Sequence, residues 1–248
     1  MLEGDEMNSA VQLITWQGLA LALLPTLIVI LILWRWQAGA GTGIYATVRM
    51  LAQLLLIGYV LVFIFDTGEP GIVMAVLGFM LVVSSWISIR PLRNKSRRLY
   101  GNALVAISVS GVVTLALISQ VVIGIEPWFD PRYLIPLAGM IFAGAMTTIS
   151  LAGERAYAEV ARGISYLEAR RIAMSAALIP MINALLAVGL VSLPGMMTGQ
   201  ILSGVSPLVA AKYQIVVMSM LFGVTGMSAA IFLYLERREL QQEAEISE

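Results

Sequence analysis

The sequence contains neither cysteine nor histidine, and only 12% of its 248 residues are charged. Without cysteine the chain can form no disulfide, no thiolate nucleophile and no sulfur-ligated metal site. Without histidine it can form no Ser-His-Asp triad, no histidine-ligated zinc or haem site and no histidine proton relay. The charged fraction is about half of the roughly 25% that is typical of soluble domains. These absences exclude several enzyme classes and argue against a soluble protein.

Apolar residues are correspondingly abundant, at 59% of the chain, and the mean hydropathy is +0.89. A soluble protein of this length cannot hide so much apolar surface inside one core. The composition therefore excludes a soluble enzyme, a disordered protein and a nucleic-acid binder. It predicts an all-α integral membrane protein, because the apolar runs are continuous rather than alternating as in a β-barrel.

Seven apolar runs are long enough to cross a bilayer, which takes roughly 20 residues per helix. Trp16 and Trp34 flank the first run, as expected at the membrane interfaces. Asp130 is expected to cap the fifth helix, with Pro131 at its first position, and Ser206 to cap the seventh. The seven predicted spans cover residues 14–34, 44–65, 71–89, 102–125, 131–151, 176–193 and 207–235.

The distribution of charge predicts the orientation. Residues 90–98 hold five positive and no negative charges, so this loop is expected in the cytoplasm by the positive-inside rule. Alternation of the spans then places thirteen of the fifteen basic residues inside and only Arg132 and Lys212 outside. The N-terminus is predicted outside and the C-terminus inside. The chain is divided into an extracytoplasmic tail (1–13), a transmembrane domain (14–235) and a cytoplasmic tail (236–248).

The segment 153–175, between the fifth and sixth spans, is polar and amphipathic. We predict a short helix ended by Gly163, followed by a second helix opened by a capping box, Ser165 to Glu168. This cytoplasmic helix pair is either an ordinary interfacial connector or a docking element for a cytosolic partner. The residues assigned to it are Glu159, Arg162, Gly163, Ile164, Ser165, Tyr166, Leu167 and Glu168.

The sixth apolar run is short. Residues 178–193 would form only about 24 Å of helix, which places Pro194 and Gly195 near the outer part of the membrane. Irregular backbone at that depth is tolerated only against protein or a water-filled cavity, so this segment is either a broken helix that lines a pathway or a surface loop. The candidate pathway residues are Arg49, Gln53, Met140, Asn183, Ser192, Pro194, Gly195, Met196 and Met197.

The sequence offers no energy source of its own. A phosphate-binding loop needs a glycine-rich turn that ends in Gly-Lys-Ser/Thr, and neither Lys95 nor Lys212 has that context. ATP-driven transport would therefore require a separate ATPase subunit. An ion-coupled secondary transporter is the alternative, although no predicted span contains the carboxylate that such carriers usually place near the midplane. An intramembrane serine protease would need a histidine or lysine base, which no span supplies.

The stretch 177–199 resembles the signature of the FetB-type permeases of ABC transporters. The likeness rests on Leu-Ile-Pro at 178–180 and on Ser-Leu-Pro-Gly-Met-Met-Thr-Gly at 192–199, with further matches at 58–61, 136–141 and 212–214. The resemblance implies a multi-pass permease subunit of the plasma (bacterial inner) membrane. It implies a separate ATPase subunit that binds the ATP and magnesium, with no cofactor on this chain. We expect an ATPase dimer with two permease copies, because one seven-helix copy is small for enclosing a pathway.

The resemblance also implies a substrate class. Bacterial relatives are linked to iron export and plant relatives to aluminium tolerance. Where the family often carries an acidic residue and a lysine, however, this chain has Asn183 and Leu186. A hard metal ion needs oxygen ligands, usually carboxylates, and the spans contain none. The expected function is export of iron or another metal species, with a chelated metal, a sugar nucleotide or a lipid-like substrate left open.

Overall fold

The computed structural model describes residues 14–92 and 95–247, and this part of the chain is almost entirely helical. Seven helices within it are long and apolar enough to cross a membrane. The predicted all-α membrane architecture with seven spans is therefore confirmed. The predicted tail 1–13 lies outside the described residues. The chain divides into two compact units, residues 1–67 and 68–248, which are described in turn.

The first unit is a helical hairpin made of α1 (Trp16–Ala22), α2 (Leu24–Arg35) and α3 (Ala40–Thr67). The first predicted span is interrupted at Leu23, which ends α1 and precedes α2. Pro25 lies at the start of α2 and cannot donate the backbone hydrogen bond that a continuous helix would need. A turn with positive φ at Gln37 and Gly39 then reverses the chain into α3.

The core of the second unit is built by α4 (Pro70–Ser88), α5 (Arg97–Ala116), α6 (Pro131–Val160) and α9 (Pro207–Leu235). The helix α7 (Tyr166–Ala187) packs on α6 and α9. Small side chains allow these helices to approach closely, as is typical inside membranes. The fully buried alanines of α5 and α6 in this core are Ala103, Ala106, Ala138 and Ala145.

Side-chain caps fix where three of these helices begin. The carboxylate of Asp130 accepts a hydrogen bond from the amide of Arg132 (2.9 Å), and Ser206 accepts one from the amide of Val209 (3.4 Å), so both predicted caps are confirmed. The hydroxyl of Ser96 caps α5 (3.0 Å to the amide of Leu99). The fourth span therefore begins at Arg97, earlier than the predicted residue 102.

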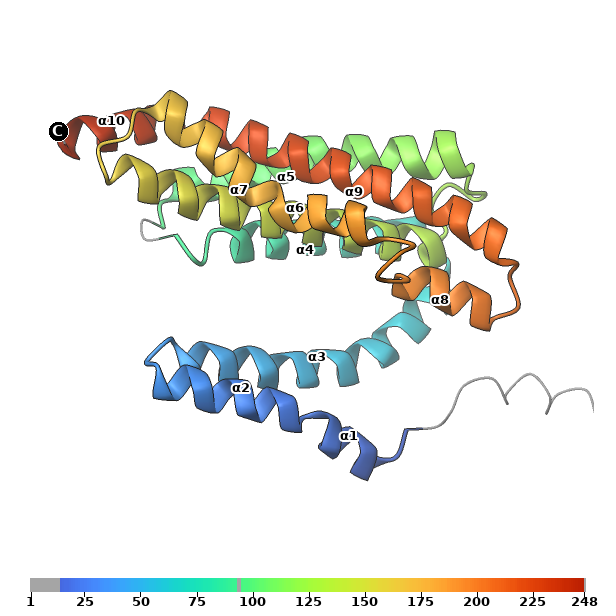
Figure 1. The fold of residues 1–248 in the computed structure, drawn as a ribbon. Helices are drawn as coiled ribbons and strands as arrows, with labels where there is room; N and C mark the ends of the chain where they lie inside the picture. Colours follow the sequence, from blue (N-terminus) through green and yellow to red (C-terminus); the bar gives the residue numbers. More distant parts are fainter. Residues whose placement is uncertain (1–13, 93–94, 248) are drawn as a thin grey trace, which may run out of the picture. The chain divides into compact units, whose positions relative to one another are not determined.

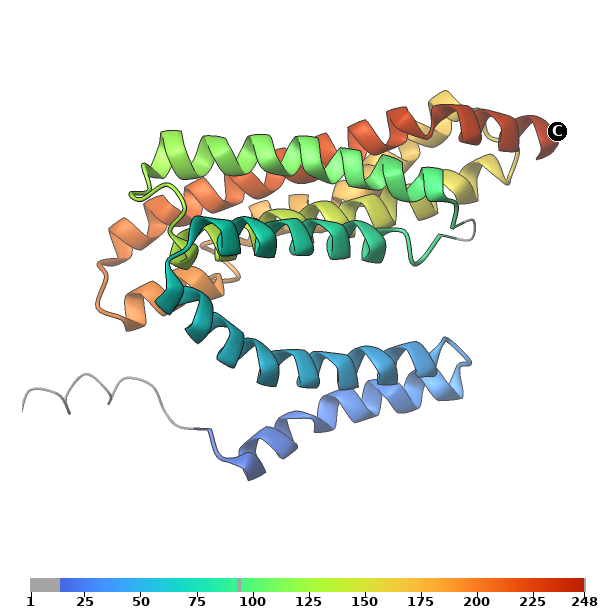
Figure 2. The same ribbon diagram turned by 180° about the vertical axis from the view of Figure 1, so that it is seen from behind.

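Two short helices mark the opposite ends of the second unit. One is α8 (Gly195–Leu202), which follows α7 and packs on α9, and the other is α10 (Arg237–Ser247), which continues α9 after Glu236. Figures 1 and 2 show them at opposite ends of the long helices, and we call these ends the α8 end and the α10 end. Residues 237–247 of the predicted C-terminal tail are thus helical.

The last turns of the fourth span are wound as a π-helix, η2 (Leu117–Ile123), which ends at Gly124 with φ 69°. The wider hydrogen-bonded turn of a π-helix is uncommon and often occurs near functional sites. Its position near the start of α6 places it at the α8 end. The hydropathy of the sequence identifies the span but not this local change of winding.

Two glycines of α5 offer a matched test of this packing. A Cβ at Gly111 would lie 2.9 Å from Cε1 of Phe142 on α6, whereas a Cβ at Gly101 would meet no atom within 4 Å. Gly111→Ala should lower stability by about 1–3 kcal/mol through overpacking. Gly101→Ala should leave stability unchanged or raise it, because alanine is the better helix former. Thermal unfolding of both variants in detergent checks the difference, and equal midpoints would contradict it.

Candidate functional site

The connection between α6 and α7 at the α10 end differs from the prediction. The helix α6 continues through Gly153 to Val160, and α7 begins at Tyr166. The predicted pair of short helices over 153–175 is therefore wrong, because those residues belong to the ends of two long spans. Only residues 161–165 form a turn between them, and we call it the α6–α7 turn.

Gly163 closes this turn as the sequence predicts. Its φ is +80°, a conformation that costs little only for glycine. Its amide donates to the carbonyl of Val160 (3.0 Å), and the amide of Ile164 donates to the carbonyl of Glu159 (3.2 Å). These two bonds satisfy carbonyl groups that the end of α6 would otherwise leave unpaired.

The predicted capping box is not formed. The side chain of Ser165 makes no capping hydrogen bond to α7 in the described structure. The carboxylate of Glu168 pairs instead with the guanidinium of Arg171 (2.6 Å), on the same face of α7. The start of α7 is anchored by Tyr166, whose ring is buried and whose hydroxyl donates to the carbonyl of Leu233 on α9 (3.1 Å).

The turn rests on a tightly packed base. The carboxylate of Glu159, only 5% exposed, pairs with Arg155 (2.6 Å) and with Arg162 (3.5 Å). Two charged partners compensate the cost of burying this carboxylate. Beneath it, alanines bring α6, α7 and α9 close together. These alanines are Ala152, Ala156, Ala169, Ala173, Ala177 and Ala229.

The eight residues predicted for coupling therefore divide into two groups. Glu159 and Tyr166 belong to the buried base, and Ile164 is partly buried. The residues that face outward form an exposed rim above the base, which is what a docking surface requires. Leu167 is the large apolar member of this rim and is 65% exposed. The other exposed or partly exposed members are Arg162, Gly163, Ser165 and Glu168.

A polar cluster that sequence reasoning missed lies beside this base. The carboxylate of Glu236, only 1% exposed, accepts hydrogen bonds from Asn102 (2.5 Å) and from the hydroxyl of Tyr157 (2.8 Å). It ties α5, α6 and the α9–α10 junction together. The sequence analysis assigns residues 236–248 to a cytoplasmic tail, whereas Glu236 is buried. The apolar spacing of Leu240 and Ala244, both packed in this region, was the available signal of an amphipathic helix.

The α8 end also differs from the prediction. The helix α7 has 22 residues, about 33 Å, so it is long enough to span a bilayer and is not a broken half-helix. It ends at Ala187, and a tight turn follows in which the amide of Gly189 donates to the carbonyl of Ser192 (3.0 Å). Pro194 precedes α8, and Gly195 is its first residue. The sixth span is thus not interrupted, and it is followed by a turn over residues 188–194 and then by the short helix α8.

A cavity of about 360 Å³ lies at this end, between η2, α6, α8 and α9. It brings together two predicted pathway residues, Met140 of α6 and Met196 of α8. Its polar lining consists of Arg132, Tyr133, Gln200 and Tyr213, none of which sequence reasoning selected. The remaining lining residues are apolar. This mixture of an apolar wall with a few polar groups is typical of ligand sites.

The other predicted pathway residues do not line this cavity. Asn183 and Ser192 are exposed on α7 and on the turn after it. Arg49 and Gln53 lie on α3 of the first unit, four residues apart and so on one helical face. Pro194, Gly195 and Met197 belong to the start of α8 but are absent from the cavity wall. Among the described residues, no group of three Asp or Glu side chains is placed to hold a metal ion.

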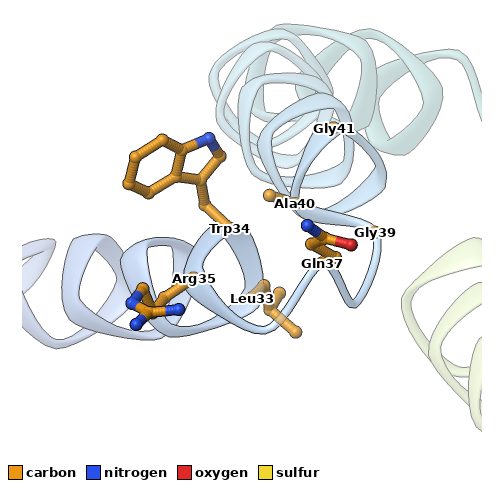
Figure 3. A pocket seen from close by; sticks show the side chains of 7 residues that line it. All are labelled: Leu33, Trp34, Arg35, Gln37, Gly39, Ala40 and Gly41. Atoms are coloured by element: carbon orange, nitrogen blue, oxygen red, sulfur yellow. The ribbon is translucent and has the colours of Figure 1, made fainter.

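A second hollow, of about 520 Å³, lies at the α2–α3 turn of the first unit. Figure 3 shows the side chains of Trp34, Arg35 and Gln37 around it, with residues 39–41 at the start of α3. Tryptophan and arginine at the end of an apolar helix are typical anchors at a membrane interface. This hollow is open and is explained by the bend of the chain at the interface.

The fold and these features define a multi-pass helical membrane protein with a compact exposed turn at one end and a small cavity at the other. Residues 16–240 match the "Uncharacterised protein family (UPF0014)", and the chain belongs to this family.

Three curated relatives illustrate the family. The UPF0014 membrane protein slr1647 of Synechocystis sp. is 34% identical over 86% of this chain and 81% of its own. The "Probable iron export permease protein FetB" of Escherichia coli is 33% identical over 91% and 92%. The protein ALUMINUM SENSITIVE 3 of Arabidopsis thaliana is 30% identical over 87% and 84%. No solved structure matches the chain.

The Glu236 cluster yields a stability prediction. Tyr157→Phe removes one hydrogen bond to a buried carboxylate and should cost about 1.5–3 kcal/mol, the usual range for hydrogen bonds to charged groups. Tyr234→Phe is the control, because Tyr234 lies nearby on α9 but is exposed, and its hydroxyl accepts a hydrogen bond from the exposed side chain of Arg237 (3.2 Å). Thermal unfolding checks both variants. A Tyr157→Phe midpoint equal to that of the control would contradict a stabilising role for the cluster.

Proposed function

We propose that this chain is the membrane-spanning permease subunit of an ABC transporter, driven by a separate ATPase subunit. The observation that carries the proposal is the α6–α7 turn, an exposed rim fixed on a buried base that connects three membrane-spanning helices. A permease of this kind needs such an element, because the energy of hydrolysis must reach the membrane through mechanical contact. The name of the Escherichia coli relative, a probable iron export permease, supports the transport role.

The base explains how a force applied to the rim would act on the membrane domain. Alanine packing holds α6, α7 and α9 at short distances, and close-packed interiors transmit displacement with little compression. Tyr166 adds a hydrogen bond from the start of α7 to the end of α9 (3.1 Å). A shift of the turn would therefore move all three helices together rather than bend one of them.

The charge distribution supports a cytoplasmic α10 end. Among the basic residues of the second unit that the structure describes, Arg132 and Lys212 alone lie toward the α8 end. The described basic residues of the α10 end are Arg90, Lys95, Arg97, Arg98, Arg155, Arg162, Arg170, Arg171, Arg237 and Arg238. Under the positive-inside rule this end faces the cytosol, where an ATPase subunit would meet the α6–α7 turn. The membrane would be the bacterial inner membrane.

The proposed assembly contains two copies of this chain and an ATPase dimer, which binds the ATP and magnesium. Two features support additional protein contacts in the membrane. Arg49 and Gln53 lie within a candidate span of the first unit, where a charged side chain that faced lipid would be costly. The second unit leaves a broad apolar face of α7 exposed, including Ile179, Ile182 and Leu186. The proposed cargo is iron or another metal species, and the proposed direction is export.

Site-specific cross-linking tests the docking claim directly, because the natural chain contains no cysteine. Leu167→Cys places a single thiol on the exposed rim, and Leu190→Cys places one at the α8 end, where Leu190 is 89% exposed. We expect the first variant to cross-link to the ATPase and the second to give no product. Absence of cross-linking from residue 167 in every nucleotide state, or equal cross-linking from residue 190, would refute the docking surface.

A substitution at Gly163 tests whether the turn transmits energy. Valine is strained at φ +80° by about 1–2 kcal/mol and would reshape the turn, whereas asparagine tolerates this conformation better. Gly163→Val should insert into the membrane normally but show ATP hydrolysis without matching transport, and Gly163→Asn should remain coupled. The ratio of transport to hydrolysis in proteoliposomes is the measurement. Normal coupling in the valine variant would show that the turn is only a connector.

A further inference from the structure

The cavity at the α8 end has a lining that selects among ligands by charge. Arg132 is the charged member of its wall, and no acidic residue lines it. Within the described residues the guanidinium of Arg132 makes no ion pair. The nearest acidic neighbour in sequence, Asp130, points its carboxylate at the backbone amide of Arg132 (2.9 Å) and caps α6. Arg132, whose side chain is exposed, therefore gives the lining residues a single formal positive charge, which favours anions over cations.

A second observation concerns Gln200 on α8. Its side-chain oxygen is buried and has no hydrogen-bond partner in the described structure. Buried polar atoms without a partner are uncommon in folded proteins, and each one calls for an explanation. Gln200 lines the cavity, so a ligand that donates a hydrogen bond would provide the missing partner. The hydroxyls of Tyr133 and Tyr213, on α6 and α9, add groups that can donate to an anion.

The remaining wall is apolar, with Met140, Met196 and several valines from α9 and the segment before it. Its volume of about 360 Å³ falls at the lower end of the range of roughly 300–1,000 Å³ that is usual for ligand pockets. A small inorganic anion would leave this apolar surface without contacts. A bare metal cation would meet Arg132 with no carboxylate to offset the repulsion.

We infer that this cavity binds a small organic anion, with an apolar body against the methionines and valines, a negative group at Arg132 and a hydrogen-bond donor at Gln200. The inference rests on the proposed transport role and names the class of cargo. If the chain exports a metal, the metal leaves as a complex with an anionic organic ligand rather than as a free ion.

The charge selectivity can be tested with two probes of similar shape and opposite charge, 2-naphthalenesulfonate and 2-naphthylmethylammonium. Binding of each to the full chain in lipid nanodiscs is measured by calorimetry, with empty nanodiscs as the baseline. The sulfonate should bind to the protein, and the ammonium should give only the baseline signal. Equal binding of both probes, or binding of the ammonium alone, would overturn the inference without any substitution.

Variants then locate the site. Arg132→Gln should weaken sulfonate binding about tenfold or more, since a charge-assisted contact is lost. Arg132→Lys should retain most of the affinity. Lys212→Gln is the matched control, because Lys212 is the other basic residue near this end and does not line the cavity. Unchanged sulfonate affinity in Arg132→Gln, or an equal loss in Lys212→Gln, would show that the anion binds elsewhere.

The role of Gln200 is tested with 6-amino-2-naphthalenesulfonate, which adds a hydrogen-bond donor to the same probe. The amino group should improve affinity about two- to tenfold in the natural chain, the usual net value of one hydrogen bond, and give no gain in Gln200→Leu. An equal gain in both proteins would remove Gln200 from the site. These measurements need no ATPase, so a negative result would leave the proposed docking at the α6–α7 turn untouched.

Discussion

The close approach of α6 to α7 and α9 is the constraint on which the other features of this protein depend. It is made by alanines, because lipid is as apolar as leucine and gives helices no hydrophobic reason to associate. Association must then come from contact between helices, and small side chains permit the closest contact. The α6–α7 turn can be short and fixed only because the two helices below it are already close. The same packing holds Tyr166 where its hydroxyl reaches the carbonyl of Leu233.

The charged groups and the cavity of this packed body lie toward its two ends, and the ends differ in kind. The α10 end is rich in paired charges, since Glu159 pairs with two arginines and Arg98 pairs with Glu239 (2.6 Å). At the same end the carboxylate of Glu236 accepts hydrogen bonds from the neutral side chains of Asn102 and Tyr157. Such an end is suited to contact with another charged protein surface. The α8 end carries few charges and leaves Gln200 unsatisfied at a cavity. It is suited to a small ligand. In the proposed transporter the α10 end receives energy from the ATPase, and the α8 end binds the cargo.

Sequence reasoning predicted the seven spans and the caps at Asp130 and Ser206, because apolar length and capping residues are local properties. It predicted the closing glycine at 163 for the same reason. It was wrong where the local sequence fitted both the end of a helix and its continuation. The charges between 153 and 175 favour the end of one helix and the start of another, although an α-helix continues through polar residues when one face stays buried. The predicted start of the sixth span, residue 176, is ten residues later than the start of α7 at Tyr166. The prediction followed hydropathy, which falls at the charged residues, although the helix continues through them.

The sequence by itself determined that the chain is a helical membrane protein, how many times it can cross, and that it contains no histidine or cysteine chemistry, because composition and hydropathy need no partner residues. Only the tertiary structure decided which polar groups meet. Asn102, Tyr157 and Glu236 are far apart in the chain, and Arg132, Gln200 and Tyr213 lie on three different helices. Which of these side chains come together depends on the register in which the helices pack. That register cannot be predicted from the sequence of any single helix.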